Sequence, residues 1–517
     1  MMININRDPN SISKRNYDLI IIGGGIYGTM LSMISAQKGI KSLLLERDDF
    51  GGATSYNSLR ILHGGLRYLQ KLDIHRFFES VGERKWFMKN FSGLVEPIPC
   101  LMPLYGRGLY KVSVFRVALL LNDLLSANRN SGITIGNKIP SGKIVSDEKV
   151  KNIFPLVDDQ GLQGGAVWFD GSIPDSEIVI KEIIKKSVAL GSEALNYTEV
   201  KDLITEDGKV KGVLASDIVS GQTFKFLSST VINSAGPWSR EISKRFDADY
   251  PELFKSSIAW NILFDREALS DHALAVTPKR PGAPTLFLRP WKGMLFAGTI
   301  HEPWNKVEKN PMPSENSVRN FINDLNSSIP KLNISGNDIL HLYAGLLPAK
   351  HEGSSKLAVR EVLLDHSRRK GPKGLYSLSG VKFTTARLVA LKTLDYIFPN
   401  LTGRTIETDF QYGSVQKDEL GIFDFNWYPD ENDNLWRENL KRIIDVESVM
   451  HLDDLILRRT TIGDNPNRAL EFASSFSNLF GWDSERREME ISRIEKFFRQ
   501  PLIPQTKFKN HKSSYSI

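Results

Sequence analysis

The sequence predicts an α/β protein: a domain of mixed strands and helices comes first, and a helical C-terminal domain follows it. A strand–turn–helix–strand unit begins at residue 17, which is typical of a parallel sheet. Residues 196–227 alternate short β-rich runs with turn pairs such as Asp207-Gly208, which indicates antiparallel strands. After residue 410 the composition shifts and apolar residues recur at helical spacing. The helices expected there are 435–445, 452–459, 467–480 and 483–499.

The first unit has a glycine-rich turn between a buried strand and a helix. Residues 17–22 predict the strand, 26–38 have the spacing of a helix, and 41–45 predict a second strand. The turn contains the glycines of a GxGxxG pattern, Gly23, Gly25 and Gly28. These glycines allow a tight turn and a close backbone approach, so the helix N-terminus can face a pyrophosphate.

Glu46 ends the second strand, about twenty residues after the glycines, where a carboxylate can bind both hydroxyls of an adenosine ribose. The complete unit predicts a Rossmann-like domain that binds an ADP-containing cofactor. The alternative is a glycine-rich turn that only packs a strand against a helix. That alternative leaves Glu46 without a role.

The loop after Glu46 is rich in small and hydroxyl residues, which can wrap a pyrophosphate without bulk. They are Gly51, Gly52, Ala53, Thr54, Ser55 and Ser58. The pair Gly64-Gly65 predicts another close backbone approach, beneath a ring system. Arg67 and Tyr68 then place a fork-shaped cation and a phenol together, which suits a phosphate or a carboxylate. Alone such a stretch is more often a solvated loop, but it directly follows a nucleotide unit.

Composition excludes several classes of protein. A chain of 517 residues with 41% apolar and 25% charged residues is globular and large enough for two or three domains. The lone Cys100 excludes an internal disulfide or a cysteine zinc site and favours a reducing compartment. The histidines lack metal-ligand spacing, so no metal is predicted, and His63, His301 and His341 are expected to be structural. The net charge of +7 comes without basic–aromatic interleaving, so nucleic acid is not an expected partner.

The predicted organisation has four parts. Residues 1–16 are polar without an apolar h-region and are expected to form a disordered lead. Residues 17–405 form the mixed domain, 410–500 the helical domain, and 504–517 a loose tail. No apolar run reaches the length of a membrane span, which indicates a cytoplasmic protein.

Several motifs resemble, in the same order, those of FAD-dependent glycerol-3-phosphate dehydrogenases, which belong to the DAO type of FAD-dependent oxidoreductase. They are HGGLRY at 63–68, NSAGPW at 233–238, RPW followed by GT at 289–299, and SGVKFTTAR at 379–387. Residues 440–463, with Asp453-Asp454 and Arg458-Arg459-Thr460, resemble the helical C-terminal domain of that family. The resemblance covers roughly residues 17–500.

This resemblance implies a Rossmann-like FAD-binding domain, an inserted antiparallel sheet that binds substrate, and a helical C-terminal domain. It implies FAD as the cofactor, with hydride transfer to flavin N5 from C2 of glycerol 3-phosphate or of a related small anionic hydroxy compound. Electrons would pass on to a quinone or a similar acceptor. The substrate contacts carried over from the family are Arg67, Tyr68, Arg360 and Lys382. Further cofactor contacts implied are Gly236, Gly380 and Thr384.

One position departs from the family pattern. The family has Gly-x-Arg-Pro where this chain has Gly345-Leu346-Leu347-Pro348, so Leu347 replaces an arginine used at the substrate. Residues 255–264 also lack the family's Lys-Gly-Ser/Thr-His pattern. Two alternatives therefore stay open. One is a flavin oxidase or dehydrogenase of a different hydroxy acid, amino acid or sugar-linked alcohol, and the other is a flavin-holding protein without turnover.

Residues 107–125 interleave cations with apolar residues. Arg107, Lys111 and Arg116 lie among leucines, valines and aromatics at helical spacing. A helix of this kind can lie in a membrane interface, which would place the protein peripherally on the inner face of the membrane. It can equally be a core helix whose cations extend to solvent. Both interpretations stay open, as does a homodimer.

Overall fold

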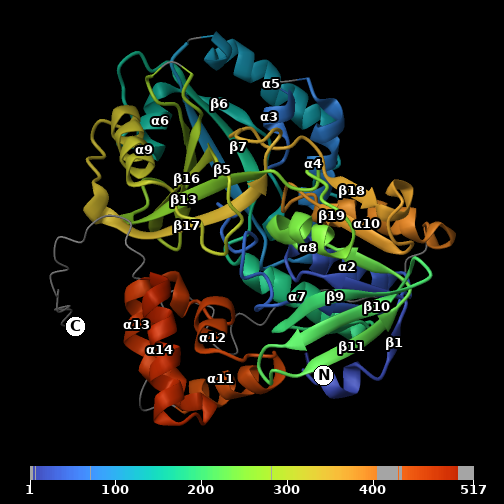
Figure 1. Ribbon diagram of the computed structural model, residues 1–517. Helices are drawn as coiled ribbons and strands as arrows, with labels where there is room; N and C mark the ends of the chain where they lie inside the picture. The colour runs from blue at the N-terminus through green and yellow to red at the C-terminus, as the bar shows by residue number, and fades with distance from the viewer. Residues whose placement is uncertain are drawn as a thin grey trace.

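A mainly parallel sheet, here called the central sheet, has helices on one face and a second sheet on the other, and it forms one half of the mixed domain in the computed structural model (Figure 1). The structure describes residues 4–498 except residues 6, 70–71, 107, 281, 404–428 and 430–433. The central sheet has the strand order β18-β19-β12-β2-β3-β8. Its strands are β2 (Leu19–Ile22), β3 (Ser42–Leu45), β8 (Glu193–Leu195), β12 (Val231–Asn233), β18 (Val362–Asp365) and β19 (Leu375–Ser379). All pairings are parallel except that of β18 with β19.

The predicted strand–turn–helix–strand unit lies in the middle of this sheet. Helix α2 (Ile26–Gln37) follows β2 and packs between α7 (Ser176–Ala189) and α10 (Ala386–Ile397). The side chains of β2 and β3 are buried on both faces, which explains their continuous apolar runs. The expected strand 17–22 is interrupted at Asp18, because Tyr17 pairs in a different sheet.

That second sheet has the order β1-β11-β10-β9 and covers the other face of the central sheet. Its strands are β1 (Asn16–Tyr17), β9 (Thr198–Glu206), β10 (Lys209–Asp217) and β11 (Thr223–Ser228). Strands β9, β10 and β11 are antiparallel, as the alternation in 196–227 predicts. Their buried residues meet those of β2 and β3 in a common core.

A nine-stranded sheet forms the other half of the mixed domain. Its strands are β4 (Ile61–Leu62), β5 (Glu96–Leu104), β6 (Lys143–Val145), β7 (Gly164–Ser172), β13 (Ser256–Glu267), β14 (Ala273–Val276), β15 (Leu286–Trp291), β16 (Met294–Pro303) and β17 (Ile339–Pro348). Most pairings are antiparallel, and only β5 with β14 is parallel among the described pairs. One face packs on α9 (Glu315–Ser328) through Trp260 and Phe321.

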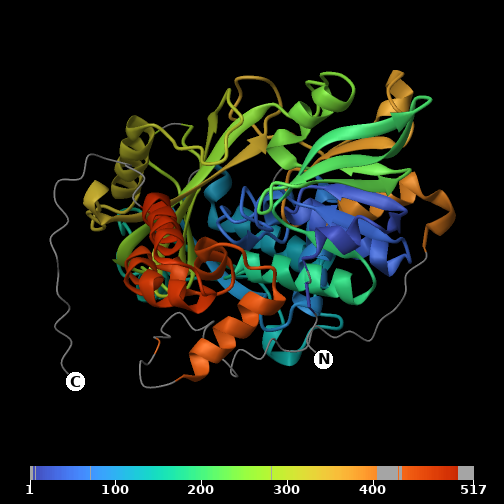
Figure 2. The same ribbon diagram turned by 60° about the horizontal axis from the view of Figure 1, so that its bottom comes forward.

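Four helices after residue 434 confirm the helices expected from the C-terminal sequence. They are α11 (Leu435–Val446), α12 (Leu452–Arg458), α13 (Pro466–Ser477) and α14 (Ser484–Phe498). They gather in one group with its own apolar core, seen in red in Figures 1 and 2. The expected start of this domain at residue 410 and the expected tail at 504–517 lie outside the described residues.

The expectation of a disordered lead is wrong for the described residues before Tyr17. Helix α1 (Pro9–Ile12) is capped by Asp8, whose side chain accepts a hydrogen bond from the Ser11 N–H. Ile5 is buried, and its N–H donates to the carbonyl oxygen of Val446 at 2.9 Å. Ile5 and Ile12 are buried apolar residues of this polar segment. They order it, because each packs into a hydrophobic core.

The remaining helices flank the nine-stranded sheet or connect the two halves. They are α3 (Leu66–Leu69), α4 (Ile74–Asn90), α5 (Val112–Leu125), α6 (Asp147–Ile153) and α8 (Ser239–Phe246). Among the described residues, no helix has the combination of length and hydropathy needed to cross a bilayer.

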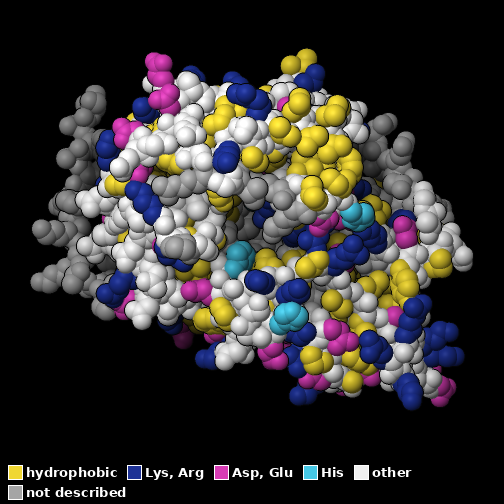
Figure 3. Space-filling model, turned by 90° about the horizontal axis from the view of Figure 1, so that it is seen from above, with side chains coloured by type: hydrophobic (Ala, Val, Ile, Leu, Met, Phe, Trp, Pro, Cys, Tyr) yellow, Lys and Arg dark blue, Asp and Glu magenta, His cyan; other side chains and the backbone are white. Residues whose placement is uncertain are grey.

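Helix α5 does not have the burial of a core helix. Phe115 and Leu119 are buried, but Val117, Leu120 and Leu124 are 58%, 69% and 69% exposed. We call the exposed apolar residues of this helix the α5 face, which comprises Val114, Val117, Leu120, Leu121 and Leu124. Figure 3 views the molecule from the top of Figure 1. It shows apolar side chains gathered on this face, on the side of the molecule where α5 lies in Figure 1. Lys111 and Arg116 are exposed, whereas Arg107 lies outside the described residues.

Candidate functional site

A cavity of about 660 Å³ lies where the parallel strands of the central sheet end against the nine-stranded sheet. The loops that follow β2, β3, β12 and β19 all line it. Ligands of open α/β sheets bind at this edge, because the strand ends and helix N-termini meet there. The volume is within the usual range for small-molecule and cofactor sites.

The glycine turn packs more closely than other residues could. A Cβ on Gly23 would lie 2.8 Å from backbone atoms of Ser234 and Ala235, and one on Gly28 would lie 1.8 Å from the Gly23 carbonyl oxygen. Gly23 and Gly25 line the cavity, and Gly28 instead lets α2 approach the turn. Gly25 is the N-cap of α2, so the positive end of this helix faces the cavity.

Glu46 lines the cavity and holds the glycine turn. Its Oε2 accepts a hydrogen bond from the Gly24 N–H at 2.5 Å, and its Oε1 accepts from the Asp48 N–H at 2.8 Å. Burial, and then the nearby Asp48 carboxylate, raise the pKa of Glu46. Beside it the Arg47 guanidinium lies 4.1 Å from the centre of the Trp238 ring, which also lines the cavity.

The loop of small and hydroxyl residues at 51–58 is held in place by hydrogen bonds of its own side chains. Ser55 Oγ accepts a hydrogen bond from the Ile26 N–H at 3.0 Å, at the start of α2. Thr54 Oγ1 donates to the Leu346 carbonyl oxygen at 3.0 Å, and Ser58 Oγ accepts from the Arg60 N–H at 3.2 Å. All three hydroxyl residues line the cavity. The loop therefore connects the glycine turn to strand β17.

Gly64 has a packing role that the sequence did not indicate. Its N–H donates to Asp170 Oδ1 at 2.6 Å, and a Cβ there would lie 1.8 Å from Arg84 Nη1. Gly64 is absent from the described cavity lining, unlike its neighbour His63. The missing side chain gives space to a buried arginine.

The second predicted cofactor loop lines the cavity through Gly380 and Thr384, as does Gly236 after β12. Tyr27, from the glycine motif, fixes this loop. Its hydroxyl donates to the Lys382 carbonyl oxygen at 2.7 Å and accepts from the Lys382 N–H at 2.9 Å. A Cβ on Gly380 would lie 1.9 Å from the Tyr27 ring. Sequence reasoning missed Tyr27, because it occupies a variable position of the GxGxxG pattern.

Three of the four predicted substrate contacts come together. The Tyr68 hydroxyl accepts hydrogen bonds from Lys382 Nζ and, at 3.1 Å, from Arg67 Nη2. Burial alone would raise the pKa of Tyr68, but Arg67 and Lys382 outweigh it and the pKa is lowered. All three residues line the cavity, with Arg67 exposed and Tyr68 buried. This end of the cavity is suited to an anionic group.

Arg360 does not join them. It is exposed, and it lines a small pocket of about 30 Å³ together with Arg76 and Lys382. The loop between β17 and β18 carries it outward. Arg360 is absent from the described lining of the main cavity, but its pocket shares Tyr27, Val381 and Lys382 with that lining, and a role at the substrate stays a prediction.

Two histidines expected to be structural line the cavity. His63 Nδ1 lies 3.1 Å from Asp170 Oδ2, and the neighbouring Trp168 Nε1 also donates to that oxygen. Burial opposes ionisation of Asp170, but His63 and Arg84 outweigh burial and lower its pKa to about 2. The second histidine that lines the cavity is His301, on β16. The only sequence signal for His63 is its place at the head of HGGLRY.

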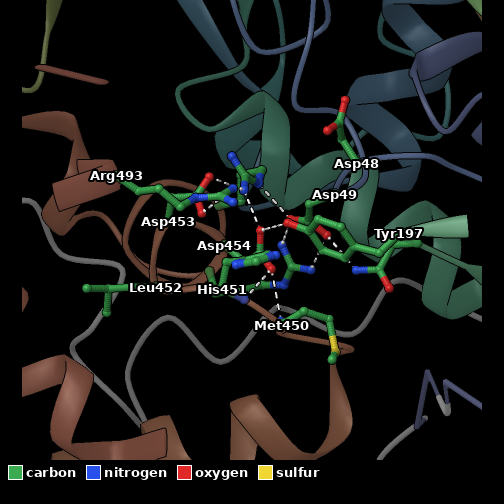
Figure 4. Close-up of polar contacts among 12 residues, drawn as sticks. Asp48, Asp49, Tyr197, Met450, His451, Leu452, Asp453, Asp454 and Arg493 are labelled. Atoms are coloured by element: carbon green, nitrogen blue, oxygen red, sulfur yellow. Dashed lines mark hydrogen bonds and ion pairs between the residues drawn. The ribbon is translucent and has the colours of Figure 1, made fainter. Parts of the chain in front are cut away.

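A network of buried charges joins the cofactor loop to the C-terminal helices (Figure 4). Asp49, three residues after Glu46, accepts hydrogen bonds from Arg458 Nε at 2.6 Å and from Arg459 Nη1 at 2.8 Å. Arg458 also pairs with Asp454, whose Oδ1 accepts from the Tyr197 hydroxyl at 2.6 Å. Burial opposes ionisation of Asp49, but the two guanidiniums lower its pKa. Arg458 and Arg459 of the C-terminal helices therefore support the loop that follows Glu46.

The fold and the cavity together define a protein with a Rossmann-like nucleotide site beside a cluster of two cations and a phenol. The family described as FAD dependent oxidoreductase matches residues 18–393. The chain belongs to this family, and its cofactor is FAD.

Known relatives agree in fold and in name. The aerobic glycerol-3-phosphate dehydrogenase of Bacillus subtilis (strain 168) is 28% identical over 386 residues, 75% of this chain and 67% of the relative. The mitochondrial glycerol-3-phosphate dehydrogenase of Homo sapiens is 27% identical over 413 residues, 76% of this chain and 55% of the relative. The structure of glycerol-3-phosphate dehydrogenase from Bacillus halodurans complexed with FAD matches with a TM-score of 0.72 and 20% identity, over 97% of this chain and 98% of that one. The predicted fold class is confirmed.

The residues of the cavity fit FAD. Gly23 and Gly25 line the turn without side chains, and Glu46, directly after β3, lines the cavity beside them. The N-terminus of α2 and the hydroxyl residues Thr54, Ser55 and Ser58 on the same wall suit a pyrophosphate.

Proposed function

We propose that the protein oxidises the C2 hydroxyl of glycerol 3-phosphate or of a related small anionic hydroxy compound. The observation that carries the proposal is the contact of Arg67, Tyr68 and Lys382 at one end of the cavity. The names of the relatives support the same substrate class. Two cations beside a phenol suit a phosphate monoester, and the same charges would stabilise an alkoxide that develops at C2.

The cofactor would be held by the loops at the ends of the parallel strands. Glu46 would bind the ribose, and the N-terminus of α2 would face the pyrophosphate. The remaining contacts proposed are Gly23, Gly25, Thr54, Ser55, Ser58, Gly236, Gly380 and Thr384. FAD, when bound, supplies the acceptor for the hydride that leaves the carbon.

His63 is the residue we propose as the proton acceptor. Its Nδ1 faces the ionised Asp170 carboxylate, so this nitrogen carries the proton and Nε2 is the free acceptor. Asp170 also stabilises the imidazolium that forms when the substrate hydroxyl loses its proton. Gly64 and Arg84 hold Asp170 in place through their own hydrogen bonds to Oδ1.

A second candidate substrate follows from Leu347. Its backbone carbonyl accepts a hydrogen bond from Ser257 Oγ at 3.0 Å, and its side chain lines the cavity. A leucine there offers no hydrogen bond to an anion, and it favours an apolar contact. This supports a substrate with one anionic group and a bulkier or less polar remainder, such as another hydroxy acid, an amino acid or a sugar-linked alcohol.

We also propose that the α5 face lies on the inner surface of a membrane. The support is the row of exposed leucines and valines next to the exposed Lys111 and Arg116. Contact with the bilayer would give the enzyme access to a quinone as its electron acceptor.

The test of the proposed reaction is anaerobic bleaching of the bound flavin by a panel of compounds. The panel contains glycerol 3-phosphate, glycerol, lactate, an amino acid and a sugar alcohol. Bleaching by an anionic hydroxy compound, but not by glycerol, is expected. Lys382→Met should weaken this response, and Lys392→Met, on the exposed surface beside Glu79, should not. Bleaching by none of the compounds would support a flavin-holding protein without turnover.

A further inference from the structure

The nine-stranded sheet presents a narrow set of side chains to the cavity. Ala259 on β13 pairs with Gly345 on β17 and with His301 on β16, so these three residues form one row across the sheet. All three line the cavity, and side chains alternate along each strand, so their neighbours in sequence pack in the core on the other face. The row therefore consists of two very small residues and one imidazole.

His301 is the one ionisable side chain that β13, β15, β16 and β17 contribute to the described cavity lining. The cations of the cavity come from other walls: Arg67 from α3, Lys382 from the loop after β19, and Arg47, Arg60 and Arg245 from the segment after β3 and from α8. Leu347 lies on the same face of the sheet as the row, two strands away from His301. Adjacent strands are about 4.8 Å apart and Leu347 lies two residues beyond the row along β17, so the backbone positions of His301 and Leu347 are about 12 Å apart.

His301 is partly exposed, and its imidazole is incompletely hydrogen-bonded. Its Nδ1 has no hydrogen-bond partner among the described residues. Burial, and then the positive charge of Arg67, lower the pKa of His301 to about 4. The ring is therefore neutral near pH 7 and can donate one hydrogen bond and accept another. Unpaired buried polar atoms are rare, and they are costly unless another group pairs with them.

The other cavity histidine differs in this respect. His63 is already oriented by Asp170, so its role is set by a partner within the protein. His301 has no carboxylate of this kind at Nδ1 among the described residues. His301 lines the cavity and no partner in the described part of the chain fixes its ring at Nδ1, so the imidazole can turn a nitrogen toward a ligand there.

We propose that His301 is a specificity-determining residue that hydrogen-bonds an uncharged oxygen of the substrate while Arg67 and Lys382 bind its anionic group. This inference rests on the proposed function, since it takes the anionic end of the substrate as given. It defines the substrate class as a hydroxy compound with one anionic group at the cationic end and a hydroxyl or carbonyl oxygen toward β16. Ala259 and Gly345 leave space between the two contacts for the carbon chain.

The test compares two phosphate monoesters that do not reduce oxidised flavin. Dihydroxyacetone phosphate carries a carbonyl and a hydroxyl, and propyl phosphate carries neither. Their dissociation constants are measured by calorimetry for the FAD-loaded wild type and for His301→Phe. The variant should bind dihydroxyacetone phosphate about 3- to 10-fold more weakly, the effect of one neutral hydrogen bond, and propyl phosphate within about twofold of wild type.

Three further variants keep the test decisive. His301→Gln should restore much of the binding, because an amide can make the same kind of hydrogen bond. His301→Ala replaces the phenylalanine variant if that one loses its flavin. His75→Gln, on the exposed surface of α4, should bind both esters as the wild type does.

Equal weakening of both esters would show that His301 only shapes the cavity, and unchanged binding of both would show that it does not contact the ligand. Either result overturns the inference and leaves the proposed function standing. If the wild type binds neither ester, the proposed function itself fails, and this inference fails with it.

Discussion

Replacing Asp49 with Asn tests whether the C-terminal helices support the cofactor loop. The carboxylate is completely buried and accepts hydrogen bonds from Arg458, from both terminal nitrogens of Arg459, and from Asn196 Nδ2 at 3.0 Å. An amide of the same shape turns one acceptor oxygen into a donor that faces a guanidinium. Removing one partner of a buried ion pair costs about 3–5 kcal/mol, because the remaining charges stay buried without compensation.

The assay is thermal release of FAD, followed by flavin fluorescence, together with the dissociation constant of FAD for the apoprotein. For Asp49→Asn, this loss of stability should lower the midpoint of FAD release by at least about 3 °C relative to wild type, and FAD binding should be weaker. Asp48→Asn is the matched control, because the Asp48 carboxylate is a third exposed and pairs only at the surface, with Arg47 and Lys309 among the described residues. Its effect should be below about 1 kcal/mol. Figure 4 shows the two neighbouring carboxylates pointing apart.

The dependence on pH gives a second readout of the same pair. Because the pKa of Asp49 is lowered in the folded protein, its stabilisation is fully present above the ordinary aspartate pKa of about 4 and is lost as the pH falls below it. The difference between wild type and Asp49→Asn should therefore shrink in acid. Equal midpoints for the Asp48 and Asp49 variants would refute a supporting role for the buried network.

Three other changes test separate parts of the account. Leu347→Arg should raise kcat/KM for glycerol 3-phosphate about tenfold or more, since a charge-assisted contact is worth about 1.5–3 kcal/mol; neutral or harmful kinetics, with Leu347→Met as control, would mean that another group already binds the anion. Changing Leu120 and Leu124 together to Glu should release the protein from anionic liposomes in sedimentation, and unchanged sedimentation would remove the lipid role of α5. Gly380→Ala should lower the flavin content of purified protein, because its Cβ would meet the Tyr27 ring at 1.9 Å; full flavin content would show that the ring can move aside.

The nucleotide end of the cavity could be predicted from the sequence because its determinants are local. The turn glycines and Glu46 lie within one strand–helix–strand unit, where spacing alone fixes which side chains meet. The structure places Gly23, Gly25 and Glu46 on the cavity wall. Even there, Gly28 serves the packing of α2 rather than the wall itself.

The substrate end depends on contacts between distant segments, which spacing does not determine. Tyr68 and Lys382 meet although 314 residues separate them, and only the family resemblance pointed to that pairing. The same resemblance predicts Arg360 at the substrate, and the structure shows it exposed beside a small pocket that shares Lys382 with the main cavity. His301 could not be singled out, because its significance depends on the register of β16 with β13.

Order in the N-terminal segment was also missed for a physical reason. A polar composition predicts disorder unless a core accepts the few apolar residues, and Ile5 finds such a core beside α11. The exposure of α5 was equally undetermined by sequence, since its apolar pattern fits a core helix and an interfacial helix alike.

The central claim is that this FAD-dependent oxidoreductase removes hydrogen from an alcohol carbon of a small anionic compound. Its most direct measurement is the rate of anaerobic flavin bleaching in single turnover. The compound that bleaches fastest in the panel is used in two forms, with hydrogen or with deuterium at the carbon that bears the reacting hydroxyl. The account predicts complete bleaching that is several-fold slower with deuterium. Bleaching at the same rate with both forms, or by uncharged alcohols as readily as by anionic ones, would contradict it.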